Sequence, residues 1–116
     1  MRRGDIYLVD LEPVIGSEAN KLRPCVLVSN ENANWMAAAL GRGVVTVVPV
    51  TSNVSRVYPF QVRLAAEATG LDRDSKAQAE QVRSLDVRRL SRRIGHVPLS
   101  LMVELDAALK LHLALP

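Results

Sequence analysis

Arg23-Pro24-Cys25-Val26-Leu27-Val28-Ser29-Asn30 is the stretch from which the fold can be argued. Its four consecutive apolar residues, Cys25 to Val28, are typical of a strand that is covered on both faces of a sheet. Pro24 cannot donate to a sheet ladder, so we place it at the first position of this strand. Arg23 then lies where a loop meets a rigid strand, and its planar, permanently charged guanidinium is suited to binding a phosphate. The alternative is a surface arginine paired with an acid such as Glu18.

The composition indicates one small domain with a hydrophobic core. The chain has 116 residues, of which 48% are hydrophobic, and we expect a single domain over 1–116. The single cysteine, Cys25, excludes an internal disulfide. The chain has only two histidines, His96 and His112, so we expect neither a zinc site nor another cofactor. No apolar run is long enough to span a bilayer and no signal-peptide h-region is evident, so we expect a cytoplasmic protein.

The charge balance favours a polyanionic partner. The net charge is +3, and the 15 cations are 12 arginines and three lysines. Arginine contacts phosphate in bidentate fashion and stacks on bases, which lysine does not match. We therefore expect RNA or DNA rather than a membrane, because no basic amphipathic helix is evident. A high-GC genome would explain the ratio of arginine to lysine, but not the positive balance.

The pattern of apolar residues predicts six short strands and two helices. We place the strands at 4–11, 24–29, 43–51, 57–65, 76–84 and 94–97, with loops at 12–22 and 66–75 and a brief turn at 86–90. The strand 43–51 is expected to be central, whereas the composition of 76–84 is equally helical. We place the helices at 30–40, with an asparagine cap and Gly41 at its end, and at 100–113. Strands with one terminal helix and no βαβ alternation predict a mainly β (α+β) chain and a partly closed barrel.

Two apolar features have more than one interpretation. Trp35 is expected in the core or at its rim, and a base-stacking platform is the less favoured alternative. The helix 100–113 is apolar on more than one face, which indicates a contact with a partner chain.

Six short motifs occur in register along the chain: Gly4-Asp5-Ile6-Tyr7, Gly16-Ser17-Glu18, Arg23-Pro24, Val50-Thr51-Ser52, Tyr58-Pro59-Phe60 and Glu80-Gln81-Val82-Arg83-Ser84. No single motif is specific, but the series resembles the MazF/PemK family of toxin endoribonucleases over residues 3–113, and mycobacterial members in particular. The resemblance implies a homodimer of small SH3-like, CcdB/PemK-like barrels. It also implies metal-independent, sequence-specific cleavage of single-stranded RNA and inhibition by a cognate antitoxin.

The resemblance also assigns catalytic residues. Arg23 matches the family's working arginine, Thr51 with Ser52 beside it matches the working threonine or serine, and Glu80-Gln81 matches the acid–glutamine pair. Some members have histidine at Ser17 and a second arginine at Gln78, so mechanisms that depend on those groups do not transfer.

Metal-free RNA cleavage normally uses the substrate's 2′-hydroxyl as the nucleophile and leaves a 2′,3′-cyclic phosphate and a 5′-hydroxyl. Arg23 is a poor base, so we assign it to the phosphorane charge. Thr51 is expected to bind a non-bridging oxygen or to orient the 2′-hydroxyl, and Glu80 is a candidate base. The residues alone favour a strand-end turn at Thr51-Ser52, whose hydroxyls satisfy backbone groups, and only the resemblance favours the catalytic role.

Base selectivity is expected from two loops and one amide. The candidate RNA-binding residues are Ser17, Glu18, Lys21, Asn53, Arg56 and Gln81. The arginine doublets at 88–89 and 92–93 are either an RNA backbone track or a solvated basic face. The alternative function is a non-enzymatic, CcdB-like toxin that binds DNA gyrase. An inactive homologue that only titrates antitoxin is a weaker alternative.

Overall fold

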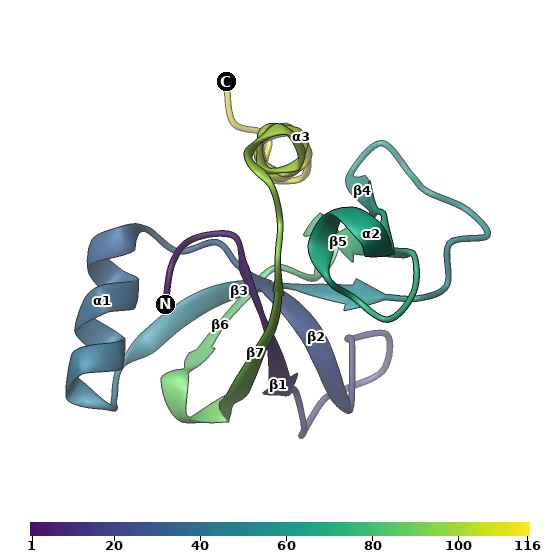
Figure 1. Ribbon diagram of the computed structural model, residues 1–116. Helices are drawn as coiled ribbons and strands as arrows, with labels where there is room; N and C mark the ends of the chain where they lie inside the picture. Colours follow the sequence, from purple (N-terminus) through teal and green to yellow (C-terminus); the bar gives the residue numbers. More distant parts are fainter.

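The computed structural model describes residues 1–116 as a mainly antiparallel β structure with a C-terminal helix (Figure 1). This confirms the predicted fold class. The strands are β1 (Asp5–Asp10), β2 (Leu22–Leu27), β3 (Val44–Thr51), β4 (Gln61–Leu64), β5 (Ser75–Gln78), β6 (Arg83–Asp86) and β7 (Leu90–His96). The helices are α1 (Glu31–Leu40), α2 (Ala66–Thr69) and α3 (Leu99–Leu113), with 3₁₀ turns η1 (Ala79–Gln81) and η2 (Val87–Arg89).

Strand β3 is the centre of the sheet, as the sequence predicts. The strand order is β4-β5-β3-β2-β1-β7, and β6 pairs with the first half of β3. Strands β5 and β4 extend the sheet from the last two residues of β3, Val50 and Thr51. Strands β4 and β7 are the two ends of this order and do not pair with each other, so the sheet is open. The predicted partly closed barrel is therefore wrong.

The predicted fifth strand, 76–84, is two strands. The 3₁₀ turn η1 separates β5 from β6, and each of the two strands pairs with a different part of β3. The predicted loop 66–75 contains α2, which ends at Gly70 with a φ of 84°. These differences arise because η1 and α2 are each a single turn, too short to give a helical period in the sequence.

Three strand boundaries also differ from prediction. Strand β4 begins only at Gln61, because the backbone and side chain of Gln61 close a turn with Tyr58. Strand β7 begins at residue 90, within the predicted turn, because its early residues pair with β1. Strand β2 begins at Leu22, so Pro24 is its third residue; Pro24 faces Leu8, and pairing with β3 starts only at the next residue.

The sheet separates two apolar clusters. One lies under α3 and includes Ile6, Val26, Val48 and Leu105. The other lies under α1 and includes Val9, Cys25, Leu27, Ala37 and Val47. Neighbouring residues of β2 and β3 therefore alternate between two cores, which explains why both strands are continuously apolar.

Helix α1 has the caps that the sequence predicts. The side chain of Asn30 accepts a hydrogen bond from Ala33 N at 2.8 Å, and Gly41 ends the helix with a φ of 63°. Trp35 on this helix is 66% exposed, so the prediction that it lies in the core or at its rim is wrong and it lies at the surface. Helix α3 begins at Leu99, directly after Pro98, and no side chain caps it.

Candidate functional site

The β2–β3 ladder ends close to Arg23 on one strand and close to Thr51 on the other. Cys25 faces Pro49 across the β2–β3 ladder. Arg23 is two residues before Cys25 and Thr51 is two residues after Pro49, so both lie just beyond this end of the ladder. Two residues that are 28 positions apart in the chain are therefore both anchored to the same end of a rigid scaffold.

Arg23 is held by its own loop and not by an acid. Its Nε donates to Asn20 O at 2.7 Å and its Nη2 donates to Asn20 Oδ1 at 3.3 Å. The expected alternative partner, Glu18, instead accepts from Ile15 N at 2.6 Å. The guanidinium of Arg23 is therefore oriented while its charge remains uncompensated, which suits a group that binds phosphate.

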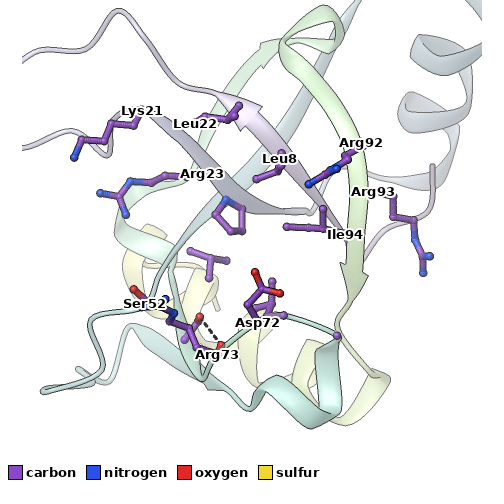
Figure 2. A pocket seen from close by; sticks show the side chains of 15 residues that line it. Leu8, Lys21, Leu22, Arg23, Ser52, Asp72, Arg73, Arg92, Arg93 and Ile94 are labelled. Carbon is purple, nitrogen blue, oxygen red and sulfur yellow. Dashed lines mark hydrogen bonds between the residues drawn. The ribbon is translucent and has the colours of Figure 1, made fainter.

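A cavity of about 720 Å³ lies beside Arg23 (Figure 2). Five cations line it: Lys21, Arg23, Arg73, Arg92 and Arg93. Asp72 is the one acid in the lining, and Ser52 is the one residue that it shares with the predicted Thr51-Ser52 pair. Arg73 and Asp72 were not predicted as site residues, because nothing in a charged loop after Gly70 indicates that it lines a cavity together with β2.

Lys21 adopts an unusual backbone conformation at the mouth of this cavity. Its φ is 68°, in the left-handed region that non-glycine residues seldom occupy. Its backbone N–H donates to Glu12 Oε1 at 3.0 Å, and its carbonyl accepts from Leu11 N at 3.1 Å. The surrounding contacts thus hold the conformation that directs the end of the β1–β2 loop (residues 11–21) into β2.

Thr51 lies outside the cavity lining, next to a buried lysine. Its Oγ1 accepts a hydrogen bond from Asn53 N at 3.3 Å, which is the strand-end turn that the residues alone suggested. Across the β3–β5 ladder Thr51 faces Lys76, which is only 8% exposed. The Nζ of Lys76 donates to Arg56 O at 2.6 Å, so a buried cation supports the segment between β3 and β4.

The segment between β3 and β4 also contains an aromatic platform. The rings of Tyr58 and Phe60 are stacked, with centroids 5.3 Å apart and an interplanar angle of 4°. The guanidinium of Arg56 lies 5.5 Å from the Tyr58 ring centroid, and Lys76 Nζ lies 5.8 Å from it. The Tyr58-Pro59-Phe60 motif pointed to this segment, but its stacking is visible only in the structure.

Glu80 on η1 has one satisfied and one unsatisfied carboxylate oxygen. Its Oε2 accepts from Gln61 Nε2 at 2.7 Å, while its Oε1 is buried without a hydrogen-bond partner. An unpaired buried acceptor is costly and is often found where function requires it. Glu80 therefore keeps a free acceptor near the β4–β5 end of the sheet.

Gln81 bridges η1 to the β1–β2 loop. Its Oε1 accepts from Ala19 N at 2.8 Å, and its Nε2 donates to Ser17 O at 3.1 Å. Both ends of the amide are thus engaged by the backbone of the loop that carries Ser17, Glu18 and Lys21. In this arrangement Gln81 fixes the loop instead of presenting a free amide.

The two arginine doublets have different surroundings. Arg88 forms an ion pair with Asp86 at 2.9 Å, and the hydrogen bond from the Arg88 side chain lowers the pKa of Asp86 to about 2. Arg89 donates to the carbonyls of Asp10 and Glu12 and so braces the start of the β1–β2 loop. In contrast, both residues of the second doublet, 92–93, line the cavity.

Asp5 is a buried acid at the start of β1. Burial raises its pKa, but hydrogen bonds from Arg2 N, from His96 at 2.9 Å and from Arg93 outweigh this effect, and the net pKa lies below 3.8. Arg93 also forms an ion pair with Asp5 at 3.1 Å, so this residue of the second doublet is partly neutralised.

Cys25 on β2 is fully buried, two residues after Arg23. Burial raises the pKa of its thiol to about 12, although the nearby charges of Arg83 and Arg23 act in the opposite direction. The thiol is therefore neutral at physiological pH and acts as a small apolar side chain. No group of three or more His, Cys, Asp or Glu side chains is arranged to hold a metal ion, and no helix has the length and hydropathy needed to cross a membrane.

Comparison with known proteins connects this geometry to one family. Residues 2–113 match the family model described as PemK-like, MazF-like toxin of type II toxin-antitoxin system. The chain is 62% identical over 115 residues to endoribonuclease MazF9 of Mycobacterium tuberculosis, covering 99% of the chain and 98% of that relative. It is 34% identical over 116 residues to endoribonuclease EndoA of Bacillus subtilis, covering 99% and 96% of the two chains.

Solved structures have the same fold. MazF from Deinococcus radiodurans superimposes with a TM-score of 0.81 at 26% identity, covering 99% of this chain and 97% of that one. A mycobacterial endoribonuclease in complex with its cognate antitoxin superimposes with a TM-score of 0.78 at 25% identity, covering 100% and 97%.

Proposed function

The chain belongs to the PemK-like, MazF-like family of toxins of type II toxin–antitoxin systems, and from this premise we propose that it cleaves single-stranded RNA at short recognition sequences without a metal ion. Curated relatives at 34% to 62% identity are endoribonucleases. The observation that carries the proposal is a cavity lined by Arg23, whose guanidinium has no carboxylate partner, and by Ser52, the neighbour of Thr51. One domain, residues 1–116, supplies all the residues assigned below.

The proposed reaction transfers the phosphodiester within the RNA. The 2′-hydroxyl oxygen attacks the adjacent phosphorus and forms the new P–O2′ bond, while the P–O5′ bond breaks. The 2′-hydroxyl proton passes to a base, and the departing 5′-oxygen takes up a proton. The products are a 2′,3′-cyclic phosphate and a 5′-hydroxyl, with no change in oxidation state.

Arg23 is assigned to the charge that develops on the phosphorane. Its guanidinium is oriented by Asn20 yet carries no carboxylate partner, so its full charge is available to the phosphate oxygens. Thr51 Oγ1, which accepts from Asn53 N, keeps its own proton to donate to a non-bridging oxygen or to the 2′-hydroxyl. Ser52 lines the same cavity as Arg23 and is assigned to the same phosphate.

Glu80 is assigned as the base for the 2′-hydroxyl. Gln61 Nε2 donates to its Oε2 at 2.7 Å and so orients the carboxylate. A positioned carboxylate of this kind is suited to receive a proton.

Recognition of the RNA sequence is assigned to the two loops that flank Arg23 and Thr51. The β1–β2 loop carries Ser17, Glu18 and Lys21, and Gln81 fixes its conformation. The segment between β3 and β4 carries Asn53 and Arg56, and the stacked rings of Tyr58 and Phe60 offer a surface for an unpaired base.

We assign a cognate antitoxin and a second copy of the chain as partners. One solved relative is in complex with its cognate antitoxin. On α3, four exposed apolar residues follow one another at intervals of four: Leu99, Val103, Ala107 and Leu111. Such a stripe forms an i±4 ridge of the kind that packs against another helix, and it supports the homodimer.

The deciding experiment incubates the purified protein with a long single-stranded RNA in EDTA and maps both new ends. Cleavage at a short recurring sequence, with 5′-hydroxyl and 2′,3′-cyclic phosphate ends, is the expected result. If folded, antitoxin-free protein leaves several RNAs intact, the proposal is wrong and the gyrase-binding alternative gains support.

A further inference from the structure

The cavity beside Arg23 has a second wall that the proposed cleavage site does not use. The first wall is the end of β2 with Arg23 and the end of β3 with Ser52. The second wall consists of the segment 70–73 and of β7, and it carries Asp72, Arg73 and Arg92 (Figure 2). The cleavage site and this second wall therefore share one continuous space.

The second wall is a built feature of the fold. Gly95 on β7 approaches the carbonyl of Thr69 so closely that a β-carbon there would overlap it. Gly70 then turns the chain with a φ of 84°, and the Thr69 hydroxyl donates to Ala65 O at 2.9 Å. Because α2 lies directly against β7, the segment that follows it is fixed at the cavity edge.

The charged groups on this wall are free of partners within the chain. The side chains of Asp72, Arg73 and Arg92 form no hydrogen bond and no ion pair, and all three residues are exposed. Arg93 also lines the cavity, but it differs because it is paired with Asp5. An acid and two arginines thus face one space without neutralising each other.

The cavity lining also has an apolar part, here called the floor. Its residues are Leu8, Leu22, Pro24, Val50, Leu71 and Ile94. A flat ring fits such a floor, a carboxylate accepts hydrogen bonds from an amino group, and guanidinium groups bind phosphate. The volume of about 720 Å³ lies within the range of roughly 300–1,000 Å³ that is typical of ligand sites.

We propose that this cavity is a subsite for one unpaired nucleotide next to the cleaved phosphodiester. Its base lies on the apolar floor with an amino group towards Asp72, and its phosphate binds Arg73 and Arg92. This inference rests on the proposed ribonuclease function and adds a base preference to it. Cytosine, adenine and guanine carry an exocyclic amino group and uracil does not, so the subsite favours an amino-bearing base over uracil.

The test compares three variants of the wall with a matched control. Arg73→Ala, Arg92→Ala and Asp72→Asn are assayed beside Arg42→Ala, which removes an exposed arginine outside the cavity. We expect Arg73→Ala and Arg92→Ala each to raise KM for a single-stranded RNA roughly tenfold with kcat retained, and to lower the salt dependence of binding by about one unit of slope. Arg42→Ala is expected to leave both quantities unchanged, and thermal melting checks that every variant folds.

Asp72→Asn tests the base preference. Mapping of cut sites in a long RNA with the wild type is expected to show uracil depleted at one position next to the cut, and the variant is expected to lose this depletion. If the wild type cleaves RNA but the three wall variants behave like Arg42→Ala, the subsite is wrong while the ribonuclease stands. A loss of binding to an acidic protein partner, with RNA cleavage unchanged, would also overturn it. If the wild type does not cleave RNA, the proposed function itself fails.

Discussion

The side chain of Gln81 accepts a hydrogen bond from the backbone N–H of Ala19 at 2.8 Å, 62 residues earlier in the chain. The same amide donates to Ser17 O at 3.1 Å. A single residue of η1 therefore fixes the loop that leads into Arg23.

This bridge predicts that Gln81→Ala loosens the β1–β2 loop. Two hydrogen bonds are lost, which costs about 1–2 kcal/mol of the free energy of unfolding, and we expect amide hydrogen exchange to accelerate over residues 15–21. RNA cleavage is expected to fall through a higher KM, because Lys21 and Arg23 are less ordered. Gln81→Glu keeps the acceptor for Ala19 but not the donor to Ser17, so its effect should be smaller. Unchanged exchange in Gln81→Ala would contradict the bridge.

Arg23 and Thr51 are predicted to act on the same phosphate. Arg23→Ala should lower kcat by roughly 10²–10³-fold, since a preorganised donor to the developing charge is lost. Arg23→Lys retains the charge without the planar fork and should recover only part of the rate. Thr51→Ser should stay active while Thr51→Val should not. Single-turnover cleavage of one oligonucleotide measures all four variants, and equal activity of Thr51→Ser and Thr51→Val would exclude a role for the hydroxyl.

The lowered pKa of Asp5 predicts how the free energy of unfolding depends on pH. Its folded pKa lies below its ordinary value, so its ionised form stabilises the fold above pH 3.8, and this stabilisation is lost as the pH falls through the folded pKa. Asp5→Asn should be about 2 kcal/mol less stable at pH 7, from the charged hydrogen bonds that it loses. The difference should shrink below pH 4.

Urea denaturation at pH 7, 5 and 3 measures this difference. Asp106→Asn is a suitable control, because Asp106 pairs with Arg3 at the surface and its side chain is 44% exposed. A difference between wild type and Asp5→Asn that is the same at pH 7 and pH 3 would show that the carboxylate charge is not responsible.

We predict that the thiol of Cys25 does not react with alkylating reagents in the folded protein. Its thiol is buried and its pKa is raised to about 12, so the thiolate that reacts with iodoacetamide is nearly absent at pH 8. Labelling followed by mass spectrometry should show modification in urea but not in buffer. Native labelling at the rate of a free thiol would mean that β2 opens far more often than its position in the core allows.

The exposed stripe of α3 predicts a dimer contact. Val103→Glu places a charge in the middle of the stripe and should convert a dimer to a monomer in light scattering. Met36→Glu places the same charge on an exposed apolar position of α1 and should leave the assembly intact. Dissociation by both variants, or by neither, would argue against α3 as the interface.

Local features with strong physical signatures could be predicted from residue types alone. The apolar runs of β2 and β3 are continuous because their residues alternate between two cores, under α1 and under α3. Asn30 and Gly41 mark the ends of α1 through a side-chain cap and a positive φ, and both are visible as residue types. The six motifs in register indicated the family before any contact was known, and residues 2–113 match that family's model.

Other features depend on contacts between residues that are far apart in the chain, and these could not be predicted from local sequence. The split of 76–84 into β5 and β6 follows from the pairing of each with a different part of β3, which no local propensity encodes. The role of Gln81 as a brace depends on a loop 62 residues away. The cavity joins Arg23 to Arg73 and Arg92 only because α2 packs against Gly95 of β7. The composition indicated an excess of arginine. Arginine side chains form a binding site only where the fold brings them to the same cavity.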